Sequence, residues 1–201
     1  MIKDTEKCAG RPCEVVRNRA YSLCGGEVLR TAGAGLRLSV SLKESSMSIP
    51  PGLKTLLDEG HVSYSTVPHT TTYTAQGTAA AMKVSGKEMA KTLVLKAGDE
   101  TLLAVLPAAH HANLEKLSNL LGKQLRLATE PEFISLFPDC ELGAMPPFGS
   151  LYHLPVYVDE SLSADEEILF NAGTHREAIR MKYVDFATLA KPVVCSFASK
   201  S

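Results

Sequence analysis

The chain has 201 residues, of which 45 % are hydrophobic and 21 % charged, which is enough apolar material for one ordinary core. Its net charge of -1 at pH 7 argues against a protein that coats nucleic acid by bulk electrostatics, because such proteins are strongly basic. No stretch approaches the roughly 18 consecutive apolar residues that cross a bilayer, and no signal-peptide pattern opens the chain, so we expect a soluble cytoplasmic protein.

The five cysteines follow no metal-binding or disulfide pattern. They stand at positions 8, 13, 24, 140 and 195, their number is odd and none belongs to a CxxC pair. We therefore expect reduced thiols. Cys140 is disfavoured as a nucleophile because its acidic neighbours, Asp139 and Glu141, oppose a thiolate.

The first 46 residues differ from the remainder. They hold eight Lys and Arg against five Asp and Glu, which leaves 13 against 17 for the remainder, and they show no sustained period of 3.6 or 2. We expect an extension without a fold over 1–46, either disordered or translated upstream of a natural start at Met47. One folded domain is expected over 47–195 and a tail over 196–201.

The elements predicted within this domain are bounded by capping and turn residues. Thr74 and Asn113 are N-cap candidates, Gly122 is a helix stop, and Gly98 with Asp99 forms the turn of a hairpin. In chain order we expect a helix over 47–60, a strand over 61–69, a helix over 74–84, a hairpin over 91–108, a helix over 113–122, a strand over 123–130, a helix over 130–138, strands over 154–160, 166–174 and 177–183, and a helix over 184–191.

The order of these elements is mixed. Hairpins with interspersed helices favour a largely antiparallel or mixed sheet over a regular βαβ array. We therefore expect a single α/β domain with a curved, mixed, largely antiparallel sheet flanked by helices.

A rigid loop is predicted over residues 139–150. Gly143, Pro146, Pro147 and Gly149 stand within seven residues, which excludes regular structure. The backbone N–H groups of such a loop are candidates to bind a carbonyl oxygen or a developing oxyanion. The same composition also fits a tight connection between two elements.

Lys91 stands at the mouth of the first hairpin strand. A lysine there can present its ammonium at the open end of a sheet, or it can be a surface lysine whose stem covers apolar neighbours. No GxSxG elbow, Walker loop, HExxH or GxGxxG motif occurs, so the commonest hydrolases and nucleotide binders lose support.

Histidines and arginines near the predicted sheet leave several interpretations open. His175 follows a glycine turn and either faces a pocket or has a structural place. Arg176 and Arg180 either contact phosphate or are solvated. His110 and His111 are adjacent and point to different sides, which argues against a shared metal and indicates surface histidines.

Four segments together resemble the YbaK/ProX family of aminoacyl-tRNA editing domains. Their order and spacing match that family over roughly residues 61–190, and they are AKTLVLK at 90–96, LAVLPA at 103–108, LFPDCELGAMPPFG at 136–149 and FNAGTHREAIRM at 170–181.

The resemblance implies a free-standing protein that hydrolyses the ester bond of mischarged aminoacyl-tRNA in trans, with no metal or other cofactor. It implies Lys91 as the principal functional residue, with Gly143 and Pro147 of the GxxxP loop as further catalytic residues. Residues implied to bind the aminoacyl group are Ala144, Met145, Pro146, Phe148, Gly149, Gly173 and His175.

The implied partner is the acceptor end of aminoacyl-tRNA, and no membrane or DNA partner is expected. A synthetase or an elongation factor would help binding, because the domain is mildly acidic. The alternative function is a non-catalytic binding module for a small ligand or a protein partner. A third interpretation, a carbonyl enzyme that forms a Schiff base at Lys91, requires a desolvated ammonium of lowered pKa.

Overall fold

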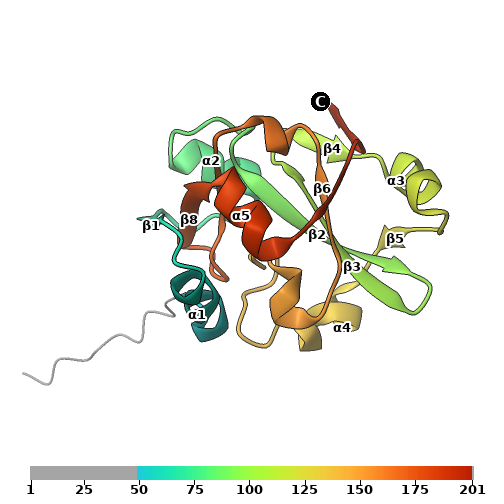
Figure 1. Cartoon of the computed structure of the whole chain (residues 1–201), viewed down its shortest axis with the longest axis horizontal. Helices are drawn as coiled ribbons and strands as arrows, with labels where there is room; N and C mark the ends of the chain where they lie inside the picture. Colours follow the sequence, from blue (N-terminus) through green and yellow to red (C-terminus); the bar gives the residue numbers. More distant parts are fainter. Residues whose placement is uncertain (1–48, 201) are drawn as a thin grey trace, which may run out of the picture. The chain divides into compact units, whose positions relative to one another are not determined.

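The computed structural model describes residues 49–200, whose arrangement Figure 1 shows. The extension expected over 1–46 and the start expected at Met47 lie outside these residues. Within the described range, no helix combines the length and the apolar character needed to cross a membrane.

Five α-helices occur in residues 49–200, and capping residues set several of their ends. Thr74 accepts a hydrogen bond from the Gly77 amide, and Asn113 accepts one from the Lys116 amide. Gly122 ends its helix at φ 64°, a conformation that glycine adopts at little cost. The helices are α1 (Pro51–Glu59), α2 (Ala75–Ala81), α3 (Leu114–Leu121), α4 (Glu130–Phe133) and α5 (Tyr183–Ala190).

Ten strands of the described range form three hydrogen-bonded ladders, of order β1-β8-β7, β10-β4 and β5-β2-β3-β6-β9. Only the pairs β3–β6 and β6–β9 run parallel within these ladders, so the predicted mixed, largely antiparallel α/β fold is confirmed. The strands are β1 (Tyr64–Pro68), β2 (Ala90–Ala97), β3 (Glu100–Pro107), β4 (His110–Ala112), β5 (Arg126–Leu127), β6 (Val156–Asp159), β7 (Glu167–Asn171), β8 (Glu177–Lys182), β9 (Val193–Cys195) and β10 (Ala198–Lys200).

The β2–β3 hairpin divides the hydrophobic core. In Figure 1, α1, β1 and β8 lie at one side of this hairpin, and α3 and β4 lie at the other. Alternate residues of β3 point to the two sides: Leu103 and Val105 belong to the larger cluster, and Leu102, Ala104 and Leu106 to the smaller one. Both faces of β3 are therefore buried.

Two predicted boundaries are wrong in the structure. The strand expected over 123–130 contains only the two residues of β5. The tail expected over 196–201 is instead ordered structure as far as Lys200, because β10 pairs with β4 and Phe197 is fully buried. A large aromatic ring without access to water cannot belong to a solvated tail.

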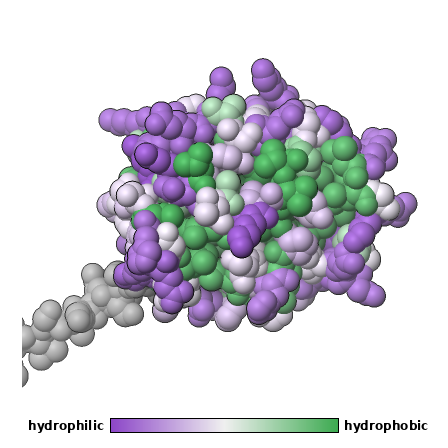
Figure 2. Space-filling model, viewed as in Figure 1, coloured by the Kyte–Doolittle hydropathy of each residue, from purple (hydrophilic) through white to green (hydrophobic). Residues whose placement is uncertain are grey.

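Apolar side chains remain exposed near the carboxyl-terminal elements. Val184 on α5 and Val193 and Val194 on β9 each keep about half or more of their surface accessible. Figure 2 shows apolar residues interspersed with polar ones on the face that carries α5. The sheet edge at β9 is thus partly apolar.

Candidate functional site

A cavity of about 210 Å³ lies where the start of β2, the end of β7 and the glycine–proline loop meet. Its wall combines one cation, one amide side chain and several small or apolar groups. The lining residues are Ala75, Ala90, Lys91, Thr92, Leu93, Gly143, Met145 and Asn171. The cavity therefore brings Lys91 and the loop together, as the sequence analysis requires.

One backbone contact between two ladders places Lys91 and Asn171 at this cavity. A parallel bridge joins Met89, just before β2, to Leu169 of β7. Lys91 and Asn171 each stand two residues further along their strands, and side chains two residues apart point to the same face. The bridge thus brings the two polar side chains, which come from different ladders, to the wall of one cavity.

The ammonium of Lys91 is held by backbone carbonyls. It donates to Ala108 O at 3.3 Å and also to His110 O, the latter in strand β4. Because an ammonium carries three N–H donors, one remains for the cavity. Burial lowers the pKa of Lys91 below its ordinary value, and this desolvation strengthens the field of the charged form at the site.

Asn171 presents an unpaired acceptor. Its side chain is 8 % exposed, and its Oδ1 has no hydrogen-bond partner among the described residues. A buried polar atom without a partner costs free energy, about 1–3 kcal/mol, and such atoms concentrate where a ligand or water binds. The sequence analysis missed Asn171, although it is a polar residue that ends a buried apolar strand.

The loop reaches the cavity through a glycine in the left-handed region. Gly143 has φ +85°, and its amide contacts the Met145 sulfur at 3.2 Å, a weak acceptor. The Ala144 amide donates to Glu141 O at 2.9 Å and is not free for a substrate. Gly143 and Met145 are the loop residues in the cavity lining, so their amides are the candidate oxyanion donors.

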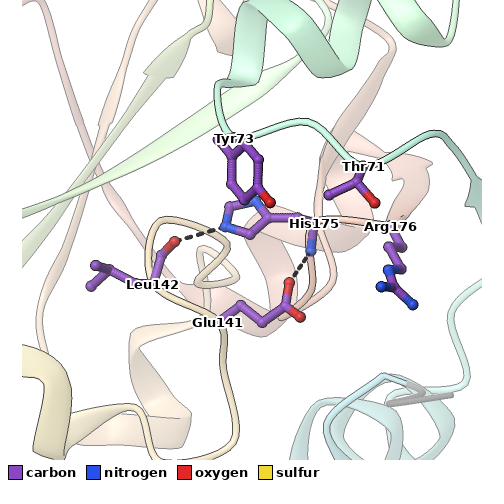
Figure 3. Close-up of a pocket in the computed structure, with 6 residues that line it drawn as sticks. All are labelled: Thr71, Tyr73, Glu141, Leu142, His175 and Arg176. Carbon is purple, nitrogen blue, oxygen red and sulfur yellow. Dashed lines mark hydrogen bonds between the residues drawn. The ribbon is translucent and has the colours of Figure 1, made fainter.

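Gly173 and His175 hold the loop through hydrogen bonds to its backbone. The Gly173 amide donates to Ala144 O at 3.0 Å, and the Glu141 amide donates to Gly173 O at 2.8 Å. His175 Nε2 bonds Leu142 O at 2.8 Å, as Figure 3 shows. Because a carbonyl only accepts, Nε2 carries the proton. These two residues therefore support the loop without lining the cavity that contains Lys91.

Figure 3 shows the residues around a second hollow, of about 410 Å³. Its wall is formed by Thr71, Tyr73, Glu141, Leu142, His175 and Arg176. Tyr73 is 78 % exposed and meets the His175 ring edge-on at 5.0 Å. Tyr73 and Leu142 line this hollow, whereas Ala75 and Gly143 line the Lys91 cavity. Because the members of each pair lie within two residues of each other in the chain, the two spaces are neighbours.

The remaining predicted loop residues lie away from both spaces. Pro146 and Pro147 are buried. The Phe148 ring packs at about 5.5 Å from those of Phe170 and Phe186, so it is a core residue and not a substrate contact. A Cβ on Gly149 would lie 2.1 Å from a backbone oxygen, so glycine is required there for packing.

Cys140 and His110 lie outside the cavity, and the structure bears on what was expected of each. Burial raises the pKa of the Cys140 thiol, which agrees with its dismissal as a nucleophile. His110 is 9 % exposed, so the prediction of a surface histidine is wrong, because β10 and Ser161 cover it. His111 is exposed on the opposite side of β4.

A family model described as the aminoacyl-tRNA editing domain matches residues 69–189. This chain belongs to that family. The match contains every residue that lines the cavity and ends before β9 and β10. The resemblance to the YbaK/ProX editing domains is therefore confirmed, together with aminoacyl-tRNA editing as the functional class.

Two proteins of similar sequence are named for reactions on tRNA. The Multifunctional Ser/Thr-tRNA deacylase ProXp-y of Escherichia coli strain K12 is 30 % identical over 113 residues, which cover 54 % of this chain and 68 % of that protein. The Proline–tRNA ligase of Heliobacterium modesticaldum is 34 % identical over 84 residues, which cover 41 % of this chain and 14 % of that enzyme.

The fold has a solved counterpart. A crystal structure described as a candidate trans-editing enzyme for prolyl-tRNA synthetase matches with a TM-score of 0.65 and 26 % identity, covering 76 % of this chain and 99 % of that one. The mixed fold of this chain is thus that of known editing domains.

Proposed function

We propose that this chain hydrolyses, in trans, the ester bond that joins a wrong amino acid to the 3′ end of tRNA. The observation that carries the proposal is the convergence of Lys91, Gly143 and Asn171 on one cavity, where Asn171 carries a buried Oδ1 with no partner among the described residues. Family membership supplies the reaction class, and the cavity supplies groups suited to it.

Lys91, Gly143 and Asn171 each have a distinct role in the proposed reaction. The remaining N–H of the Lys91 ammonium binds the carbonyl oxygen or the terminal phosphate of the substrate. The Gly143 amide exchanges its weak sulfur contact for the oxyanion that forms as water attacks the ester. Asn171 Oδ1 accepts a hydrogen bond from the amino acid and thereby orients it.

The size of the cavity favours a small amino acid. The space of about 210 Å³, bounded by Ala90, Met145 and Leu93, is smaller than the roughly 300–1,000 Å³ of ordinary ligand pockets. Steric exclusion admits small substrates, and a buried acceptor selects those that carry a matching donor. We therefore propose an aminoacyl group with a small side chain that bears a hydroxyl, in keeping with the name of the Escherichia coli relative.

The tRNA end then occupies the neighbouring hollow. When the amino acid fills the Lys91 cavity, the attached end of the tRNA extends past Leu142 and Gly143 into this hollow. Tyr73 offers an exposed ring on which a base can stack, and Arg176 is exposed beside it to contact phosphate. Because the rest of the domain is mildly acidic, we propose that a synthetase or an elongation factor assists binding.

The reaction is proposed to proceed without a metal. Within residues 49–200, no carboxylate, imidazole or thiol lines the Lys91 cavity, and such groups are the usual ligands of catalytic zinc. Water activation then depends on positioning, on the charge of Lys91 and on the free hydroxyl of the terminal ribose.

A panel of mischarged tRNAs tests the proposal. The full chain, treated with a chelator, is expected to release small hydroxylated amino acids faster than large ones. The Lys91→Ala variant is expected to lose this activity, and Lys96→Ala, a lysine of the same strand whose ammonium bonds the hairpin turn, is expected to keep it. Absence of deacylation across the whole panel would favour a binding module instead.

A further inference from the structure

Strands β9 and β10 lie beyond the region that matches the family model. Residues 196–200 are nevertheless tied to the middle of the chain. β10 pairs antiparallel with β4, so Lys200 lies opposite His110, and the Asn113 amide donates to Phe197 O at 2.8 Å. Phe197 is fully buried in the cluster that contains Leu106 and Leu117.

A buried carboxylate fastens this segment. Asp159, at the end of β6, is 2 % exposed, and its Oδ2 accepts the amides of Phe197 at 2.7 Å and Ala198 at 2.6 Å. Its Oδ1 accepts the Ser161 hydroxyl and the Ser161 amide. Hydrogen bonds from backbone amides to a carboxylate are stronger than those to neutral groups.

The same network reaches His110. Because the Ser161 hydroxyl gives its proton to Asp159, the 3.3 Å contact between Ser161 Oγ and His110 Nδ1 requires His110 to donate. His110 is thus held by its side chain through Ser161 and by its backbone through β10. Its carbonyl oxygen is the acceptor for the ammonium of Lys91.

We infer that Asp159, Ser161 and β10 form a brace that holds the His110 carbonyl and thereby sets the position of the Lys91 ammonium. This inference rests on the proposed role of Lys91 in deacylation. Asp159 and Ser161 are positioning residues, since neither lines the cavity. A displacement of the ammonium by about 1 Å is enough to slow a reaction roughly 100-fold, so small movements of β4 matter.

Competitive acetylation of lysines in the full chain tests the brace without any tRNA. Ser161→Ala removes the link to His110, and Ser163→Ala, which removes a hydroxyl bonded to the Glu160 carbonyl in the same turn, is the matched control. The labelling of Lys91, measured by peptide mass spectrometry against exposed Lys87, is expected to rise several-fold in Ser161→Ala and to stay unchanged in Ser163→Ala.

A second pair of variants separates positioning from folding. Asp159→Asn keeps an oxygen acceptor, so its labelling is expected to lie between those of the wild type and Asp159→Ala. In deacylation, Ser161→Ala is expected to lower kcat roughly tenfold with KM unchanged. If Lys91 labelling in Ser161→Ala and both Asp159 variants equals that of Ser163→Ala, the brace is wrong. Altered labelling in a chain that deacylates nothing supports the brace and refutes the proposed function separately.

Discussion

Lys91 and Asn171 line one cavity because an isolated parallel bridge, Met89 to Leu169, joins the two ladders whose strands carry them. One residue supplies a donor and the other supplies an unpaired acceptor. An amino acid carries both a carbonyl oxygen and an ammonium, so this pair is complementary to the group that editing must recognise.

Replacing Asn171 by Ala tests the acceptor. Loss of one hydrogen bond to the substrate should remove about 1–3 kcal/mol, which lowers kcat/KM roughly 5- to 160-fold. Stability in urea should stay the same or rise, because the wild-type oxygen is buried and has no partner within residues 49–200. Steady-state deacylation and urea unfolding are the measurements. A variant that is less stable but fully active would assign Asn171 to the core.

Replacing Gly143 by Ala tests the loop backbone. A Cβ at this position meets only His175 Cε1, at 3.7 Å, so the cost is mainly the strain of φ +85°, about 1–2 kcal/mol. Gly98→Ala is the matched control, since Gly98 also has positive φ and a Cβ there would meet no atom of the described residues within 4 Å, but it lies in the distant hairpin turn. Both variants should lose similar stability, and only Gly143→Ala should lose activity. Equal activities would remove Gly143 from the site.

The pH dependence of substrate binding reports on Lys91. Burial lowers its pKa from the ordinary value of 10.5, so the native chain loses this proton at a lower pH than an exposed lysine does. If the charged form binds the substrate, affinity for a non-hydrolysable aminoacyl-adenosine amide should fall on the alkaline side below pH 10.5. Titration calorimetry at several pH values measures this, and Lys91→Ala should bind weakly with no alkaline fall.

Asp159 predicts a loss of stability in acid. Burial alone would raise its pKa, but hydrogen bonds from Ser161 and from the amides of Phe197 and Ala198 outweigh that effect and lower it from 3.8. A carboxyl whose pKa is lower in the folded state stabilises the fold above its unfolded pKa, and this contribution disappears as the pH falls through the folded pKa. Thermal unfolding between pH 7 and 2 should show a smaller acid effect in Asp159→Asn.

Arg176 should affect tRNA and not the aminoacyl group. If its guanidinium contacts phosphate, Arg176→Ala should raise KM for mischarged tRNA and reduce the salt dependence of binding by about one unit of slope. Hydrolysis of a short aminoacyl-adenosine ester should be unchanged. Arg126→Ala is the control, because Arg126 is exposed and paired with Glu132 on the other side of the hairpin. Parallel effects on both substrates would contradict the second hollow as the tRNA subsite.

Local signals explain why much of the fold can be predicted. The caps at Thr74 and Asn113 and the glycine stop at Gly122 act within a few residues, so they are visible in the sequence. β4, β9 and β10 have three residues each and no alternating pattern, and they exist only because distant segments pair with them. Such strands cannot be inferred from local periodicity.

The site shows the same division. Lys91 and Gly143 can be selected from the family resemblance. The other loop residues that the resemblance implies differ in their packing: Met145 lies in the cavity wall and Phe148 in the core. Asn171 at the end of a strand looks solvated in sequence, whereas in the structure it is buried beside the bridge at Leu169 and pairs with Ala178 of β8. Tertiary contacts therefore decide which residues can meet a substrate.

Single-turnover deacylation of a mischarged tRNA carrying a small hydroxylated amino acid, with the wild-type chain and Lys91→Ala compared at equal concentration, tests the central claim most directly. The account predicts rapid release of the amino acid by the wild type and a rate close to spontaneous hydrolysis for the variant. Equal rates for the two chains would show that the Lys91 cavity does not perform the reaction.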